Sequence, residues 1–235
     1  MLFFIKLCDI MEEQMFESPR REKNQMRFSF IKSLFHVVED IGFNDNEIEA
    51  AEKKWGILPE VLKDYYKELG QHDRINKSQN YLREPKLLYE SGNYVIFYIE
   101  NQGVAEWGIK KEDLCKEDPP VYCRVSGDEY VLETDTLMEF FNAMTLFQAA
   151  SWGMTYSCED IYMISEEQAE KIRGKYKKLP FELRQWCEMS FYANNEDEVI
   201  MLMINDDYDL LYGSEDEEHF KLIEEFIETI EKDKY

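Results

Sequence analysis

The sequence predicts an α+β protein in which helices pack on an antiparallel sheet. Near the start, apolar residues recur at helical spacing. Short strand-like runs separated by turn residues follow, and two further amphipathic helices come after hairpins. With 235 residues, 44% of them hydrophobic, the chain can bury the core of one large domain. We expect a loosely ordered segment at 1–25 and one domain at 26–235 with an elaboration at about 151–195. Met11 is a second candidate for the initiator methionine.

The first predicted helix runs from Met26 to Ile41, where apolar residues recur every three or four positions. Its apolar face consists of Phe28, Ile31, Leu34, Phe35, Val38 and Ile41. Because glycine commonly follows the last residue of a helix, Gly42 is its expected end.

Two more helices are predicted from their end signals. Asn44 is placed to cap the second helix, with Glu47 completing a capping box, and Gly56 ends it. Pro59 suits the first turn of a third helix, which ends at Gly70. The N-terminal part of the domain is therefore predicted to be helical.

The middle of the chain changes to a strand-like pattern. Residues 94–99 and 104–109 are rich in aromatic and β-branched residues and flank the turn 101–103, and residues 121–125 and 130–132 repeat this plan. Two consecutive hairpins predict a meander. A helix from Thr136 to about Ala150 is expected to cover one of its faces, with Thr136 and Glu139 as a capping box. The apolar side of this helix consists of Leu137, Phe140, Phe141, Met144 and Phe147.

The C-terminal part continues with strands and capped helices. Residues 160–164 form a possible strand, and Ser165 with Gln168 caps a polar helix through about Lys178. Leu179-Pro180 then opens a further segment. A hairpin at 199–204 and 208–212 follows. Ser214 with Glu217 is expected to cap the closing amphipathic helix.

The charge of the chain argues against nucleic-acid and membrane partners. Its 27 Lys and Arg against 50 Asp and Glu give a net charge of −23, which repels phosphate backbones and anionic lipid headgroups. No apolar run approaches the roughly 20 residues of a membrane span. The apolar start at 1–7 has one lysine and no cleavage site, so it is a poor secretory signal. We expect a cytoplasmic protein.

The titratable residues show no catalytic motif. His36, His72 and His219 are the three histidines, and none has a local partner that would orient it for acid–base work. The five cysteines form neither a disulfide framework nor a zinc ribbon, and we expect reduced thiols. They are Cys8, Cys115, Cys123, Cys158 and Cys187. An enzyme hypothesis would rest on a cysteine or carboxylate site that the sequence does not reveal.

No cofactor or metal site is predicted either. The chain contains neither of the glycine-rich loops that bind phosphates. Asn205, Asp207 and Asp209 fit the first positions of a twelve-residue calcium loop. However, Leu210 stands where the loop needs glycine, and Asp216 stands where it needs glutamate.

The sequence feature that points most strongly to a function, rather than to the fold, is the acidic C-terminal part. We select as a candidate partner-binding surface Asp206, Asp207, Asp209, Glu215, Asp216, Glu217 and Glu218. One interpretation is a solvated face that keeps the protein in solution. The alternative is an electrostatic docking surface that speeds encounter with a basic protein.

Several short motifs resemble the SUKH superfamily over about residues 45–150. They are Gly56-Ile57-Leu58-Pro59, Glu100-Asn101-Gln102-Gly103-Val104, Trp107-Gly108-Ile109, Asp118-Pro119-Pro120-Val121, and Leu137 with Phe140-Phe141. The closing strand, turn, strand and helix from Val199 resemble the usual end of that family more weakly.

This resemblance implies a non-catalytic α+β protein-binding module. Bacterial members neutralise a cognate polymorphic or contact-dependent toxin by occluding it, often a nuclease, and the partner expected here is such a toxin. The yeast members suggest the alternative of a regulatory or scaffold adaptor related to cell-wall synthesis regulators. The sequence makes no prediction of the oligomeric state.

Overall fold

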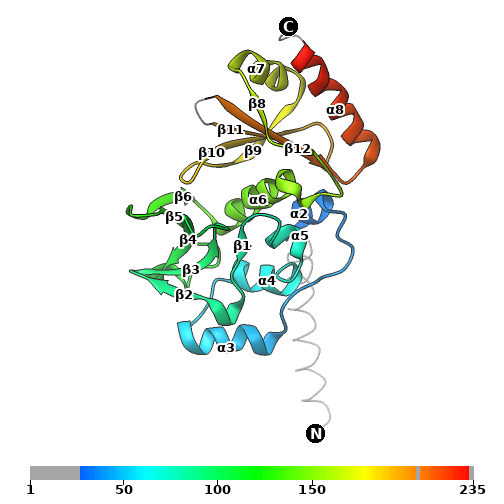
Figure 1. Cartoon of the computed structure of the whole chain (residues 1–235). Coiled ribbons are helices and arrows are strands. Elements are labelled where there is room, and N and C mark those ends of the chain that lie inside the picture. Colours follow the sequence, from blue (N-terminus) through cyan, green and yellow to red (C-terminus); the bar gives the residue numbers. More distant parts are fainter. Residues whose placement is uncertain (1–26, 205–206, 233–235) are drawn as a thin grey trace, which may run out of the picture.

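Helix α6 (Leu137–Gln148) lies between two six-stranded antiparallel sheets in the computed structural model, which describes residues 27–204 and 207–232 (Figure 1). The predicted α+β class is confirmed. The segment expected to be loosely ordered, residues 1–25, lies outside the described residues. None of the helices in the described part is long and apolar enough to cross a membrane.

The described residues of the N-terminal half form four helices and the first sheet. The helices are α2 (Ser29–Leu34), α3 (Asp45–Trp55), α4 (Glu60–Glu68) and α5 (Asp73–Asn76). The strands are β1 (Tyr81–Leu82), β2 (Tyr89–Ser91), β3 (Tyr94–Ile99), β4 (Ala105–Lys110), β5 (Val121–Val125) and β6 (Val131–Thr134). They are ordered β1-β3-β4-β5-β6, and β2 also pairs with β3. Short 3-10 helices precede β2 (Pro85–Leu87) and follow β4 (Lys111–Asp113).

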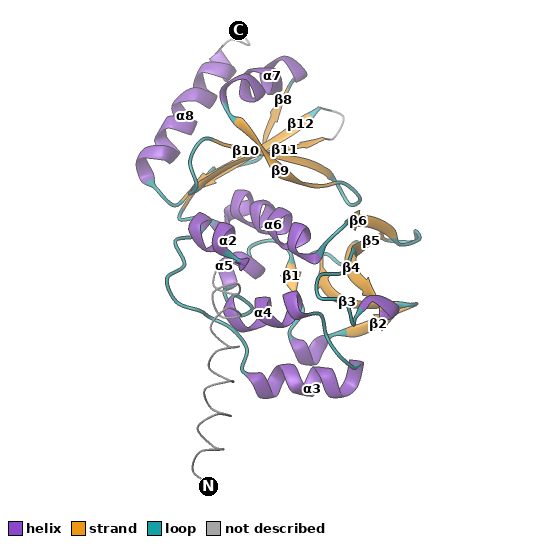
Figure 2. Cartoon of the chain, turned by 180° about the vertical axis from the view of Figure 1, so that it is seen from behind, coloured by secondary structure: helices purple, strands orange, loops and turns teal. Residues whose placement is uncertain are grey.

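The C-terminal half forms the second sheet and its cover. The strands are β7 (Tyr156–Ser157), β8 (Tyr162–Ile164), β9 (Lys177–Leu183), β10 (Glu188–Ala193), β11 (Glu198–Ile204) and β12 (Tyr208–Ser214). They are ordered β7-β12-β11-β10-β9, and β8 also pairs with β12. Helices α7 (Glu166–Lys175) and α8 (Glu217–Lys232) lie on the side of this sheet opposite α6 (Figures 1 and 2).

Most of the predicted local signals are confirmed. Asn44 with Glu47 forms the capping box of α3, and Ser165 with Gln168 forms that of α7. Of the capping box predicted at Thr136, one of the two hydrogen bonds is found, in which the Thr136 side chain accepts from the Glu139 amide at 3.1 Å. Both predicted hairpins of the meander are present, with β3 paired to β4 and β5 paired to β6.

The first helix is much shorter than predicted, because α2 ends at Leu34 and does not continue to Ile41. His36 adopts a left-handed backbone conformation, with φ of 51°. The Val37 amide donates to the Lys32 carbonyl at 2.9 Å and the His36 amide to the Ser33 carbonyl at 3.2 Å. This is the Schellman pattern that terminates helices.

The chain beyond α2 is extended along α4, and its apolar residues were wrongly assigned to a helix face. Val38 is 95% exposed and Ile41 is 47% exposed. Gly42 does not stop a helix but allows close backbone contact, since a Cβ atom there would lie 1.9 Å from the Lys67 carbonyl oxygen. The Ile41 amide donates a hydrogen bond to the Glu68 carbonyl at 2.9 Å.

Residues 151–195, expected to be an elaboration, are part of the second sheet and its cover. They supply β7 to β10 and α7, which together form much of the second sheet and its cover. The predicted C-terminal hairpin is confirmed as β11 and β12, which lie inside that sheet. The cap of α8 was predicted wrongly. Asp216 Oδ1, not Ser214, accepts from the amides of Glu218 and His219 at 2.8 and 3.0 Å.

Helix α6 is buried against both halves of the molecule. Phe140 packs against Phe97 of the first sheet, with ring centroids 5.3 Å apart. Phe147 packs against Trp186, in the β9–β10 loop, at 5.5 Å. Buried apolar residues of both halves therefore form one continuous hydrophobic core that runs through α6.

Candidate protein-binding surface

The predicted acidic residues do not form one surface. Asp206 lies outside the described residues. Asp207 and Asp209 are at the start of β12, whereas Glu215 to Glu218 follow its end. Since β12 has seven residues, and a strand rises about 3.3 Å per residue, the two groups are separated by the length of that strand, roughly 20 Å.

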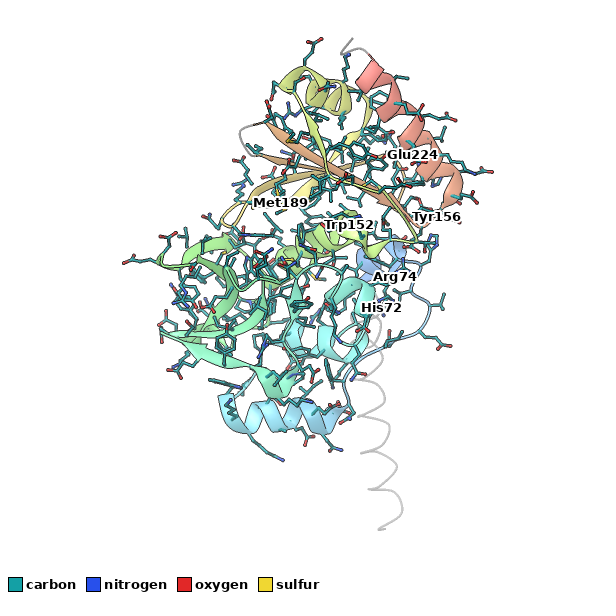
Figure 3. All side chains as sticks on the ribbon, viewed as in Figure 1. His72, Arg74, Trp152, Tyr156, Met189 and Glu224 are labelled. Atoms are coloured by element: carbon teal, nitrogen blue, oxygen red, sulfur yellow. The ribbon has the colours of Figure 1, made fainter. Side chains whose placement is uncertain are left out.

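Glu215 links the two halves of the chain. Its side chain is only 6% exposed and is ion-paired with Arg74 of α5. It also accepts from the Thr155 amide at 3.1 Å and from the Thr155 hydroxyl at 2.8 Å. Arg74 in turn donates to the Gly153 carbonyl at 2.8 Å, and Figure 3 places it beside the junction of the halves, below Tyr156. The prediction that Glu215 is exposed to a partner is therefore wrong.

The remaining acidic candidates are divided between structural and exposed positions. Asp216 caps α8, and hydrogen bonds from the amides of His219 and Glu218 lower the pKa of its carboxyl. Glu217 is exposed and pairs with Lys221 at 2.5 Å. Glu218 and Asp207 are also exposed. The acidic groups thus contribute to the overall field rather than to one contact site.

A different surface gathers aromatic side chains on the outer face of the first sheet. In β4, Trp107 and Ile109 are buried toward the core, so Glu106, Gly108 and Lys110 point to the other side. Residues directly opposite on neighbouring strands share a face. Tyr94 is opposite Lys110, Tyr122 is opposite Gly108, and Arg124 is opposite Glu106.

We call this surface the tyrosine face. It consists of Tyr89, Tyr94, Tyr122 and Tyr130 with Glu106, Lys110 and Arg124, and all seven residues are partly exposed. Helices α4 and α6 lie on the opposite side of the sheet (Figures 1 and 2).

The aromatic rings of the tyrosine face are in mutual contact. Tyr94 stacks on Tyr130 with centroids 3.9 Å apart and meets Tyr122 at 5.4 Å. The Lys110 ammonium lies 4.5 Å from the centroid of Tyr122, and the Arg124 guanidinium lies 5.2 Å from that of Tyr130. These cation–π contacts hold the two basic groups close to the rings.

Glu106 anchors the ring hydroxyls. Tyr89 donates to its carboxylate at 2.6 Å, Tyr130 donates to the other oxygen, and Arg124 pairs with it at 2.7 Å. Burial alone would raise the pKa of Glu106, but hydrogen bonds from the tyrosines and the charge of Arg124 lower it. Burial and the bond to Glu106 raise the pKa values of both tyrosines. The phenols therefore stay protonated as donors at neutral pH.

The floor of the tyrosine face is filled by Ile96. This residue is opposite both Gly108 and Tyr89 and is fully buried. A Cβ atom at Gly108 would lie 2.6 Å from Ile96 Cδ1, so glycine leaves the room that the isoleucine occupies. The rings rest on a packed floor and are held in fixed positions.

Two of the three histidines, for which the sequence predicted no partner, lie near the same carboxylate. His36 and His219 both approach the carboxylate of Asp197, whereas His72 lies beside Phe35. Burial, followed by the charge of Arg74, lowers the pKa of His72. No group of three or more potential ligands among the described residues could hold a metal ion.

Three of the four described cysteines are disfavoured as nucleophiles. Burial raises the pKa values of Cys123, Cys158 and Cys187, which disfavours the reactive thiolate. Cys115 is exposed, and Cys8 lies outside the described residues.

Sequence reasoning missed the tyrosine face, although one signal for it was present. The alternation of buried and exposed residues in β4 shows which of its side chains face away from Trp107. The pairing of β4 with β5, which brings Tyr122 to the same face, depends on strand register.

Comparison with family models, with curated proteins and with solved structures finds no match for this chain.

Proposed function

We propose that the chain is a non-catalytic, SUKH-like protein-binding module that contacts its partner through the tyrosine face, and that it acts as a bacterial immunity protein. The observation that carries this proposal is the packed cluster of Tyr89, Tyr94, Tyr122 and Tyr130 on the outer side of the first sheet. Tyrosine and arginine are enriched among the residues that dominate binding energy at protein interfaces.

The rigidity of the tyrosine face favours tight binding. The hydroxyls of Tyr89 and Tyr130 are fixed by Glu106, and the Tyr94 ring contacts the rings of Tyr122 and Tyr130. Because these side chains are already ordered, little conformational entropy is lost when a partner covers them. Tyrosine also supplies a large apolar area together with a polar tip.

The resemblance to the SUKH superfamily supports the choice of partner. The motifs that carry it, such as 100–104 and 107–109, lie in or beside β3 and β4, the strands under the tyrosine face. The family resemblance points to a cognate toxin, with a basic nuclease as the candidate that suits a net charge of −23. Inhibition would then be stoichiometric occlusion.

Charge and contact would have separate roles in this proposal. The net charge would accelerate the encounter with a basic partner, and salt would reduce the association rate by screening. The tyrosine face would set the dissociation rate, which salt changes much less. This division replaces the single electrostatic docking surface that the sequence suggested, because the acidic candidates lie at both ends of β12.

The proposed function is tested in two steps. This chain is first co-expressed with the product of the gene next to its own, the candidate toxin, to see whether the two proteins co-purify. Cells that express the candidate toxin are then tested for rescue of growth by this chain. We expect a stable complex and restored growth with the wild-type chain, and loss of both with Tyr94→Ala/Tyr130→Ala. Leu222→Ala is the control, since Leu222 is 58% exposed but lies on α8, which covers the second sheet and not the first. A complex without rescue would favour the adaptor function, and turnover of a small substrate would refute a non-catalytic module.

A further inference from the structure

The charge of the tyrosine face differs in sign from the charge of the whole chain. The face contains two cations, Lys110 and Arg124, and one carboxylate, Glu106, whereas the chain as a whole has a net charge of −23. A third cation, Arg83, lies beside the face, with its guanidinium 5.5 Å from the centroid of Tyr89. General attraction between an acidic chain and a basic partner therefore does not explain what this face contacts.

Only one of the two cations on the face is balanced by an acid. Arg124 pairs with Glu106 at 2.7 Å, and two tyrosine hydroxyls donate to the same carboxylate. Lys110 forms no ion pair within the described part of the chain. The exposed Glu112, two residues further on, is near enough for its charge to act on Lys110, but the two side chains do not pair. The face thus presents one ammonium group without a carboxylate partner.

The four rings of the face are already in contact with groups of this chain. Tyr94 and Tyr130 stack on each other. A guanidinium group lies over each of Tyr89 and Tyr130, and the Lys110 ammonium lies over Tyr122. A cation of a partner would bind against the ring faces, so it would have to displace a cation of this chain. The remaining binding capacity of the face therefore lies in its hydrogen-bond donors.

The donors of Lys110, Tyr94 and Tyr122 lie together. Tyr94 is directly opposite Lys110 in the pairing of β3 with β4, and its ring meets that of Tyr122 at 5.4 Å. Burial raises the pKa of Tyr94 and the charge of Lys110 opposes this rise, so the hydroxyl lies within range of the ammonium.

Two hydroxyl protons remain available at this point. The Tyr94 hydroxyl makes no hydrogen bond to any of the described residues. A hydrogen bond from the Lys110 ammonium to the Tyr122 oxygen raises the pKa of Lys110 and leaves the phenolic proton of Tyr122 to be donated elsewhere. An ammonium group and hydroxyl donors are the groups from which a carboxylate accepts strong hydrogen bonds.

We propose that Lys110, Tyr94 and Tyr122 form a subsite for a carboxylate of the protein partner. This inference rests on the proposed function and adds to it that the partner places an Asp or Glu at this point of a surface that is otherwise basic. The carboxylate completes a charge pair that the free chain lacks. A related partner with lysine or arginine at the same point is rejected by like charge, so the subsite contributes specificity as well as affinity.

The test is a set of double-mutant cycles on the complex with the product of the adjacent gene, with the dissociation constant as the readout. Lys110→Met removes the charge and keeps the length of the side chain. Lys177→Met is the matched control, because Lys177 is exposed on β9 of the second sheet and its loss changes the net charge equally. Each Asp and Glu of the partner is changed in turn to Asn or Gln. We expect Lys110→Met to weaken binding about tenfold, and neutralisation of one partner carboxylate to have the same effect without adding to it.

The outcomes separate the subsite from the proposed function. The subsite is refuted if Lys110→Met binds as tightly as Lys177→Met, or if no partner carboxylate couples to Lys110. The tyrosine face still stands in that case, as long as Tyr94→Ala/Tyr130→Ala weakens binding. If the wild-type chain forms no complex, the proposed function fails and the subsite fails with it.

Charge reversal provides a second test of the same contact. Lys110→Glu should lose more affinity than Lys110→Met and should be rescued when the coupled carboxylate of the partner is changed to lysine. Absence of rescue would contradict a direct contact. Binding of a single-stranded oligonucleotide that is lost in Lys110→Met would assign the subsite to phosphate and overturn the proposal.

Discussion

Tyr94 stacks on Tyr130 with ring centroids 3.9 Å apart and planes inclined by 24°. One ring comes from β3 and the other from the residue before β6, so the stack forms only when β4 and β5 pair correctly between them. The contact therefore links the register of the first sheet to the shape of its outer face. The proposed partner binding and the pairing of the strands would then depend on the same residues.

The hydroxyls bonded to Glu106 should control its acidity. In Tyr89→Phe/Tyr130→Phe the carboxylate loses two donors, so its pKa should rise, and the protein should lose roughly 1 kcal/mol per hydrogen bond at neutral pH. A depressed carboxyl pKa stabilises the fold above the unfolded value, and that stabilisation disappears as pH falls through the folded value. The double variant should therefore show a weaker acid-side decline in stability, measured by urea unfolding from about pH 3 to 7. Tyr81→Phe is the control, and an identical decline in the double variant would refute the role of Glu106.

The fit between Gly108 and Ile96 predicts a coupled pair of substitutions. Gly108→Ala would place a methyl group 2.6 Å from Ile96 Cδ1 and 3.1 Å from the Val95 carbonyl oxygen. We expect a cost of about 1–3 kcal/mol from overpacking. Ile96→Val removes the Cδ1 atom, so the double variant should be more stable than the sum of the single changes predicts. Strict additivity in a double-mutant cycle by urea unfolding would show that the two side chains do not compete for this space.

The two acidic residues Glu215 and Glu218 should differ in their effect on stability. Glu215→Gln weakens the ion pair of the nearly buried Glu215 with the half-exposed Arg74 and the hydrogen bonds from Thr155, with an expected cost of about 1.5–3 kcal/mol. Glu218→Gln changes an exposed side chain, and its effect should stay within about 0.5 kcal/mol. Thermal and urea unfolding of both variants measure the difference. Equal effects would mean that Glu215 does not hold the halves together.

His72 should oppose His219 in the pH dependence of stability. Burial lowers the pKa of His72, so the native state disfavours its protonation, and this penalty is absent above about pH 6.5 and grows as pH falls. His72→Gln should therefore make the protein relatively more stable at acid pH. His219→Gln should make it relatively less stable there, since the pKa of His219 is raised. Unfolding free energies between about pH 5 and 8 test both signs, and slopes that change in the same direction would contradict them.

Local signals in the sequence predicted helix starts and hairpins well. Asn44 and Ser165 cap their helices because the partner amide lies three residues away, and this distance is fixed by helix geometry. The end of α2 was missed because the apolar spacing continues through Val38 and Ile41, although the backbone turns at His36. Periodicity cannot show which apolar residues find a surface to cover.

The sequence could not predict which elements far apart in the chain meet in the fold. Helix α6 has one charged residue, Glu139, and apolar residues on several sides, which indicates burial on more than one face. The second sheet that covers it is built from strands whose order differs from their order in the chain. The approach of His36 and His219 to Asp197 likewise depends on tertiary packing and has no local pattern.

The proposed binding of a partner through the tyrosine face is tested most directly by the dissociation constant of the complex with the adjacent gene product. Tyr94→Ala/Tyr130→Ala should weaken binding by about thirtyfold or more, mainly through faster dissociation, because interface hot spots contribute at least about 2 kcal/mol. Lys110→Ala provides a second variant on the same face that leaves the ring stack in place. It should weaken binding to a smaller degree, and Leu222→Ala, on α8, should not. Unchanged affinity in both face variants, with melting temperatures confirming that they are folded, would contradict the account.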